Sequence, residues 1–373
     1  MVVVGAGIAG SCTALALRRQ GASVTLVEAH DVGHMRAASG GEHRLLRSSH
    51  GTDELYTRWS RHARAGWLEL GALVGERLFL PCGVLVLAST ADCAWEDASA
   101  ATLARLGVPH VIVPAEDIPV RFPTVHPGGL KYAIWETESG AIYSQRCVIR
   151  TVEQFRREGG RFVRAKVTTD EHERPLLDGQ PIRAGLVVMA CGAWMPMLFR
   201  RTLGRLLKNY RQDLIFLATP DADERWLSSE HPGFIDHHLG AYGVAADAGL
   251  GFKVGLNLRE QPIDVDNEDR MPDPTVIARM RRYVAFRYPA LAPMPVLEMR
   301  VCQITCTPDT HFLIDAHPDH ADVLFVCGDS GHLAKHGPML GEYAARVALG
   351  EQETDPRFRY GDRSGVSLAD RPQ

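Results

Sequence analysis

The beginning of the chain alternates apolar, strand-like segments with a helical pattern. Residues 2–4 form a β-branched apolar run, and residues 11–19 place apolar side chains at helical spacing. A second apolar segment, residues 23–27, follows and ends in the acidic Glu28. The order strand, helix, strand predicts the start of a parallel sheet covered by helices. The first strand begins one residue into the chain, and the sequence leaves the natural start of the protein open.

The later pattern contains two kinds of segment. The continuous apolar run of residues 185–191 suits a strand that is buried on both faces of a parallel sheet. Apolar spacing predicts four further helices, the first with Thr52 as its N-cap, at residues 52–70, 145–158, 275–288 and 336–348. The remaining pattern predicts strands at residues 78–88, 108–114, 161–168, 296–306, 311–315 and 322–327, with alternating strands and glycine turns across 210–258.

We therefore expect an α/β (α+β) fold in which one domain interrupts another. Residues 1–77, 145–205 and 310–360 carry the βαβ-type pattern of a dinucleotide-binding, Rossmann-like domain. Residues 78–144 and 206–309 carry the pattern of an antiparallel-sheet domain that would hold a substrate. A site between two such domains is a natural place for a ligand.

Composition narrows the class of partner. The chain is 45% hydrophobic and 23% charged with a net charge of −4, so no basic field favours nucleic acid or an anionic membrane. No apolar run approaches the roughly 20 residues of a membrane-spanning helix, and no secretory pattern begins the chain. We expect a cytoplasmic monomer or small homo-oligomer. The tail from residue 352, and 361–373 above all, is rich in Asp, Arg, Pro and Gly and is expected to be poorly ordered.

Cysteine and histidine are frequent but show no metal-binding spacing. None of the eight cysteines forms a CxxC pair, and the sixteen histidines contain no HExxH motif. We therefore expect neither a metal site nor a disulfide framework. His237 and His238 lie in a loop-like stretch and are interpreted as polar surface.

A glycine motif between the first strand and the first helix indicates a dinucleotide site. Gly5 allows a tight turn, Gly7 lets a pyrophosphate approach the backbone, and Gly10 lets the helix pack against the strand. Ile8 and Ala9 complete the turn, and the pyrophosphate would lie at the positive helix N-terminus.

The acidic residue that ends the second strand completes this motif. Glu28 follows Gly10 by 18 residues and is placed to accept hydrogen bonds from ribose hydroxyls. The motif fits NAD as well as FAD, so it does not by itself choose the cofactor.

Further segments give the chain a family resemblance. They read Gly-Gly-Glu-His-Arg-Leu-Leu-Arg at 40–47, Gly-Phe-Lys-Val-Gly-Leu-Asn at 251–257, Cys-Gln-Ile-Thr-Cys-Thr-Pro-Asp at 302–309 and Gly-Asp-Ser-Gly-His-Leu-Ala-Lys at 328–335. From residue 2 to about 350 the chain resembles the monomeric sarcosine oxidase and N-methyltryptophan oxidase group of the D-amino-acid-oxidase superfamily. This resemblance implies FAD as the cofactor.

The resemblance implies roles for the substrate-binding residues. Arg47 and Lys335 would share the substrate carboxylate, which suits the planar donor fork of arginine. Arg44 would lie against the flavin ring. Tyr242 would form part of the substrate pocket, and His332 is a candidate pocket residue rather than a base.

It also implies roles around the flavin. Lys253 matches the lysine that promotes reaction with oxygen, because a fixed cation stabilises superoxide. Cys302 matches the cysteine that carries the flavin through a thioether, and Cys306 is a nearby competitor with the wrong spacing. Backbone N–H groups around Gly331, with Lys335, would contact the pyrimidine end of the flavin.

The chain departs from the sarcosine-oxidising pattern inside the substrate pocket. Asn257 stands where those enzymes have histidine, Ile304 where they have tyrosine, and Val244-Ala245 where they have Phe-Pro. The resemblance therefore implies an amine or amino acid that carries a carboxylate but differs from sarcosine at its amine end.

The activity expected from these residues is FAD-dependent oxidation of a secondary or cyclic amine to an imine, with O2 reduced to H2O2. Three alternatives stay open: a flavin dehydrogenase, a desaturase of a cyclic or carrier-bound amino acid in a specialised biosynthetic pathway, and a non-catalytic flavoprotein subunit. An NAD-dependent dehydrogenase would leave Cys302, Lys253 and Lys335 unexplained.

Overall fold

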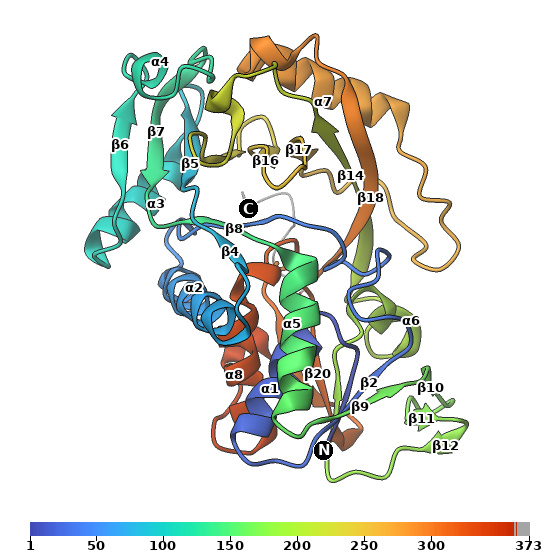
Figure 1. Cartoon of the computed structure of the whole chain (residues 1–373). Coiled ribbons are helices and arrows are strands. Elements are labelled where there is room, and N and C mark those ends of the chain that lie inside the picture. Colours follow the sequence, from blue (N-terminus) through green and yellow to red (C-terminus); the bar gives the residue numbers. More distant parts are fainter. Residues whose placement is uncertain (362, 364–373) are drawn as a thin grey trace.

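The first of two large sheets occupies the lower half of the computed structural model, which describes residues 1–361 and 363 (Figure 1). Its neighbouring strands are parallel except at one edge, where β19 runs antiparallel to β20. In spatial order the strands are β19 (Leu313–His317), β20 (His320–Cys327), β13 (Val187–Met189), β1 (Val2–Val4), β2 (Thr25–Glu28) and β9 (Arg161–Arg164).

Both faces of this sheet are buried, which explains the continuous apolar runs. On one face, Val3 and Val188 pack in a core cluster with the helices α1 (Ile8–Arg19), α2 (Glu54–Val74), α5 (Ser144–Arg157) and α8 (Gly337–Ala348). On the other face, Val4 and Met189 pack with Phe199 and with side chains of α6 (Met195–Leu198). The predicted doubly buried strand at 185–191 is confirmed as β13, the central parallel strand.

The second large sheet has eight strands and lies in the upper half of Figure 1. In spatial order they are β18 (Val296–Cys306), β14 (Lys208–Leu217), β17 (Phe252–Leu256), β16 (Ala241–Val244), β15 (Gly233–Asp236), β5 (Val84–Ser89), β7 (Leu130–Glu136) and β6 (Val111–Pro114). All neighbouring pairs are antiparallel except β15 and β5, which are parallel. The prediction of an antiparallel sheet is therefore confirmed, except that β15 and β5 pair in parallel.

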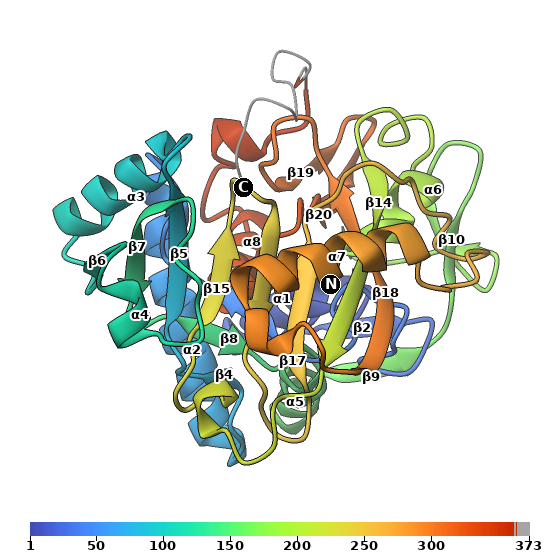
Figure 2. The same ribbon diagram turned by 90° about the horizontal axis from the view of Figure 1, so that it is seen from above.

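One helix covers the outer face of the second sheet. Figure 2 shows α7 (Pro274–Arg287) crossing over β17 and β14. Met280 and Val284 of α7 pack in one cluster with Ile215 and Val254 of these strands. The smaller helices α3 (Ala94–Arg105) and α4 (Ile118–Arg121) lie beside β5, β6 and β7 in the same view. The opposite face of the second sheet is left to contact the first half of the molecule.

A third, three-stranded sheet joins the two halves. It pairs β3 (Arg44–Leu46) with β8 (Gly140–Ile142), which also pairs with β4 (Phe79–Leu80). A further small sheet, β10 (Val167–Thr169), β11 (Pro175–Leu177) and β12 (Gln180–Pro181), lies at the side of the first. The β3 pairing fixes the segment that carries Arg44 and Arg47 where the two large sheets meet. No helix among the described residues is long and apolar enough to cross a bilayer.

Two local predictions are wrong. The N-cap of α2 is Asp53 rather than Thr52, and its side chain accepts a hydrogen bond from the Tyr56 N–H at 3.3 Å. The start of the predicted tail is packed rather than poorly ordered, because the Phe358 side chain is fully buried and Arg357 pairs with Asp53 at 2.9 Å. The rest of that predicted tail, residues 362 and 364–373, lies outside the described part of the chain.

Candidate functional site

A cavity of about 580 Å³ is lined by residues of both large sheets. Its walls come from the turn after β1, the segment around β3, the strands β16, β17 and β18, and the loop after β20. Every site residue predicted from the sequence lines this cavity except Gly10. The fold therefore brings together residues as far apart in the chain as Gly5 and Lys335.

Two glycines of the turn, Gly5 and Gly10, have no room for a side chain. Gly5 has a φ of +97°, and a Cβ there would lie 2.5 Å from the Ala190 carbonyl oxygen. A Cβ on Gly10 would lie 1.8 Å from the Gly5 carbonyl oxygen, so this glycine shapes the turn from behind the cavity. Gly7 is the N-cap of α1, which leaves the positive end of the helix facing the cavity.

An acid is fixed at the end of β2, beside this turn. The Glu28 carboxylate accepts hydrogen bonds from the backbone N–H of Ala6 at 2.7 Å and of His30 at 2.9 Å. Both bonds hold the carboxylate at the cavity wall. The bare glycine turn, the open helix terminus and this acid fit the phosphates and ribose of a dinucleotide.

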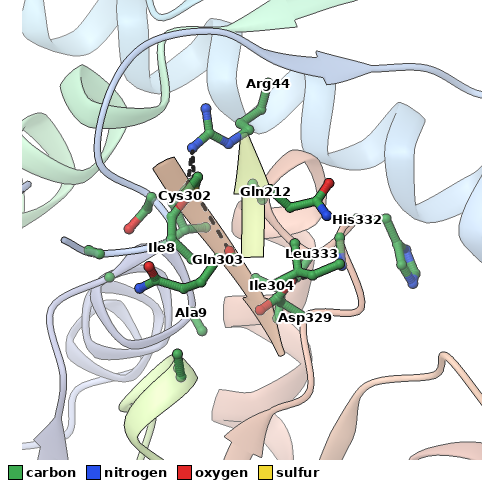
Figure 3. Close-up of a pocket in the computed structure, with 18 of the residues that line it drawn as sticks. Ile8, Ala9, Arg44, Gln212, Cys302, Gln303, Ile304, Asp329, His332 and Leu333 are labelled. Atoms are coloured by element: carbon green, nitrogen blue, oxygen red, sulfur yellow. Dashed lines mark hydrogen bonds between the residues drawn. The ribbon is translucent and has the colours of Figure 1, made fainter. Parts of the chain in front are cut away.

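Cys302 and Arg44 meet on the cavity wall (Figure 3). The Arg44 guanidinium donates to the carbonyls of Ala38 at 2.8 Å and Gly40 at 3.1 Å, and it lies 3.6 Å from Cys302 Sγ. The alternative cysteine, Cys306, is 1% exposed and does not line the cavity, and burial raises the pKa of its thiol to about 12. Of the two cysteines in β18, Cys302 is therefore the one that lines the cavity.

Lys253 is buried in the cavity wall. Its Nζ donates to the backbone carbonyl of His43 at 2.6 Å. Burial, with the nearby Arg44 cation, holds the pKa of Lys253 well below its ordinary value.

His43, the partner of Lys253, is a site residue that sequence reasoning missed. Its backbone is left-handed, with a φ of 59°, and its side chain is fully buried. Neither ring nitrogen has a hydrogen-bond partner among the described residues. Burial and the Lys253 cation lower the pKa of His43 to about 3, so the ring is neutral.

Two basic side chains, Arg47 and Lys335, line the cavity close to each other. The Arg47 and Lys335 side chains are 6% and 3% exposed, and Arg47 donates to the Ser49 carbonyl. Burial lowers the pKa of Arg47 to about 10, and burial together with Arg47 holds the pKa of Lys335 well below its ordinary value. Glu136 is the acid that favours the charged form of both Arg47 and Lys335. Its oxygens, however, already accept hydrogen bonds from the Ser48 N–H at 2.6 Å and the Ser49 N–H at 2.9 Å.

Aromatic and histidine side chains surround these cations. The ring of Trp95 packs against both the Arg47 guanidinium, at 5.2 Å, and the His237 ring, at 4.1 Å. The interpretation of His237 as polar surface is wrong, because this ring lines the cavity, whereas His238 is exposed. His332 also lines the cavity, and its ring bonds the Thr310 carbonyl at 3.0 Å.

The positions that depart from the sarcosine-oxidising pattern also line the cavity. Asn257, Ile304 and Val244 lie in its wall, and burial raises the pKa of the neighbouring Tyr242 to about 12. Arg259 is another cavity residue, and no motif in the sequence marks it. No group of three or more His, Cys, Asp or Glu side chains in the described ranges could hold a metal ion.

The fold and the cavity define an oxidoreductase that has a dinucleotide-binding turn and several basic side chains in its cavity wall. Residues 1–347 match the family model described as FAD dependent oxidoreductase, and the chain belongs to this family. It is 28% identical over 372 residues to the monomeric sarcosine oxidase of Bacillus sp. (strain B-0618), covering 95% of this chain and 93% of that protein.

Two further comparisons agree. The chain is 27% identical to the N-methyl-L-tryptophan oxidase of Salmonella arizonae, covering 96% of each chain. The crystal structure of L-proline dehydrogenase from P. horikoshii has the same fold, with a TM-score of 0.80 at 19% identity over 95% of this chain and 94% of that chain.

Proposed function

We propose that this protein is an FAD-dependent oxidase of a secondary or cyclic amino acid, which forms an imine and reduces O2 to H2O2. The observation that carries the proposal is the convergence of Arg47 and Lys335 on the cavity that also meets the glycine turn and Cys302. Glu136 is the one acid that acts on both of these buried cations, and its oxygens already accept backbone hydrogen bonds. The two cations therefore form a binding site for a carboxylate.

The chain offers a consistent set of groups for FAD. We propose that the backbone of Gly5, Gly7, Ile8 and Ala9 holds the pyrophosphate, with Gly10 shaping the turn and Glu28 binding the ribose. Arg44, Cys302 and Gly331 would hold the flavin, and Cys302 is the proposed point of covalent attachment. When bound, the flavin supplies the two-electron chemistry.

The remaining residues would orient the reactants. Arg47 and Lys335 hold the carboxylate, and Tyr242 and His332 shape the pocket around the amine. Lys253 presents a fixed, buried cation, which would stabilise charge that develops on oxygen. The proteins named above act on sarcosine and N-methyl-L-tryptophan, and Asn257 and Ile304 give this pocket a different lining.

We also propose that the two large sheets mark two interleaved domains. The strands of the first sheet lie within 1–77, 145–205 and 310–360, and those of the second lie within 78–144 and 206–309. Residues of both domains line the cavity, so one domain would hold the cofactor and the other the substrate. A cytoplasmic location and a monomeric or small oligomeric state remain predictions from the sequence.

The test is an anaerobic titration of the purified holoenzyme. N-methyl, cyclic and ordinary amino acids are added in turn, the visible flavin band is followed, and air is then admitted. Bleaching by one compound, with fast recovery in air and formation of peroxide, is the expected result. Slow recovery would contradict an oxidase and support a dehydrogenase, and no bleaching by any amine would contradict amine oxidation.

A further inference from the structure

Arg259 presents an unpaired guanidinium to the cavity. It follows β17, the strand that carries Lys253, and its side chain lines the cavity wall. One nitrogen, Nη2, donates to the Ser330 carbonyl at 3.3 Å. The other two, Nε and Nη1, are buried and have no hydrogen-bond partner among residues 1–361 and 363. A guanidinium has five N–H donors, so most of its capacity is unused.

No carboxylate of residues 1–361 and 363 forms an ion pair with this charge. Asp329 is the acid that acts on Arg259 electrostatically, but its two oxygens already accept from the Gly331 N–H at 2.8 Å and the Thr305 N–H at 2.9 Å. The adjacent Glu260 pairs instead with Arg279 at 2.9 Å. Arg259 forms no ion pair with any carboxylate of the described chain. Arg259 is partly buried, and leaving its buried Nε and Nη1 without partners is costly, which favours a ligand that supplies the anion.

The contacts of Arg259 place it at the loop after β20, which carries Lys335 and also Gly331, the proposed flavin contact. Ser330, which it touches, begins the short loop that carries His332 and Lys335. Asn257, two residues before Arg259, also lines the cavity. The glycine turn and Glu28, which would hold the pyrophosphate, lie on other elements, after β1 and at the end of β2. Figure 3 shows Asp329, Leu333 and Ile304 close together in the cavity wall.

We propose that Arg259 binds a second acidic group on the substrate. The inference rests on the proposed function and specifies its substrate class: an amino acid whose amine carries one carboxylate at the Arg47–Lys335 end and another acid toward Arg259. Arginine suits this task because its planar fork binds a carboxylate or phosphonate through two parallel hydrogen bonds. Asn257 adds an amide donor on the same wall.

The test compares two non-oxidisable probes on the FAD-loaded enzyme. Methylthioacetate has one carboxylate and thiodiacetate has two, and in both a sulfur atom replaces the amine nitrogen. A third probe, 3-(carboxymethylthio)propanoate, extends the reach of the second acid by one carbon. Dissociation constants are read from the change in the flavin absorption spectrum. We expect wild type to bind at least one dicarboxylate about tenfold or more tightly than methylthioacetate, as one charge-assisted pair provides.

Arg259→Gln should reduce this preference to within about twofold and leave the affinity for methylthioacetate unchanged. Arg259→Lys keeps a positive charge and should retain part of the preference for the dicarboxylate. This variant therefore distinguishes an effect of the missing charge from an effect of impaired folding. Arg279→Gln, which removes a partly exposed arginine of α7 that pairs with Glu260, is the matched control and should behave as wild type.

Each other outcome decides against the inference. No dicarboxylate preference in wild type, or an undiminished preference in Arg259→Gln, overturns it. Loss of FAD or a shifted flavin spectrum in ligand-free Arg259→Gln, with the preference retained, would assign Arg259 to the cofactor. If methylthioacetate binding depends on Arg47 but no effect depends on Arg259, only the second acid site fails. If methylthioacetate binding does not depend on Arg47, the proposed function fails with it.

Discussion

The Lys253 ammonium is bonded to the backbone carbonyl of His43 at 2.6 Å, across 210 residues of sequence. This bond ties β17 of the second sheet to the left-handed turn just before β3. The lysine is thereby held at one place in the cavity wall rather than free to swing into solvent. A cation fixed in this way costs no reorganisation when charge develops nearby.

Replacing this lysine should separate the two halves of the reaction. Lys253→Met keeps the length of the side chain and removes its charge, so reoxidation of the reduced enzyme by O2 should slow by about 100-fold or more. Reduction by the amino acid should change far less. Stopped-flow absorbance under anaerobic and aerated conditions measures the two rates separately. Equal slowing of both would assign Lys253 to substrate binding instead.

The carboxylate site can be tested through Arg47. Arg47→Lys retains the charge but loses the planar fork, so KM for the best amino acid of the panel should rise about tenfold or more. The matched amine that lacks the carboxylate serves as the control, because its kinetics should not change. Lys335→Met should act in the same direction. A KM that stays constant in both variants would exclude the carboxylate role.

Much of the fold could be predicted because its signals are local. The turn from Gly5 to Gly10 and the run at 185–191 each depend on neighbours within one element, and both were found. Helix boundaries were less certain, because Thr52 and Asp53 are both good caps and the packing of Asp53 against Arg357 is not visible in the sequence.

The missed site residues depend on distant contacts. Glu136 binds the Ser48 N–H from 88 residues away, and no local pattern marks either residue. His237 was misread as surface because its burial comes from Trp95, which lies on a separate helix. Arg259 matters because its Nε and Nη1 have no partner among the described residues, and this follows only from the packing of the whole cavity.

The two cysteines of β18 give contrasting expectations for flavin attachment. Cys302 lines the cavity and Cys306 does not, so only Cys302→Ala should release the flavin. After acid precipitation, the yellow colour should stay with the protein in wild type and in Cys306→Ala, and should pass into the supernatant in Cys302→Ala. Mass spectrometry of the intact chain gives an independent reading. Colour in the supernatant for wild type would show that the flavin is not covalently bound.

Gly10 of the glycine turn should tolerate no methyl group. A Cβ on Gly10 would overlap the Gly5 carbonyl at 1.8 Å, so Gly10→Ala should lower the free energy of unfolding by about 1–3 kcal/mol and reduce bound FAD. Gly185→Ala is the control, because a Cβ there meets no atom within 4 Å. Chemical denaturation and the flavin-to-protein absorbance ratio measure the two effects. Full FAD content in Gly10→Ala would argue against a close approach of the cofactor to this turn.

Buried neutral histidines should make the protein unstable in acid. Burial and Lys253 lower the pKa of His43 to about 3, and burial also holds the pKa values of His50, His332 and His336 well below their ordinary value. In the unfolded chain these rings take up a proton near pH 6.5. Their contribution is therefore fully present above pH 6.5 and is lost as the pH falls toward the folded pKa. For His43 alone the loss from pH 6.5 to 5 is about 2 kcal/mol.

The test compares how the free energy of unfolding depends on pH in matched variants. His43→Asn removes this titration with a residue that accepts a left-handed backbone, so its stability should fall less steeply below pH 6.5 than that of wild type. His238→Asn alters an exposed histidine and should keep the wild-type slope. Asp329 acts in the opposite sense, because burial raises its pKa to about 6 and stability then increases as the pH falls. The difference in slope between variants therefore isolates His43, and equal slopes would show that its ring is protonated in the folded protein.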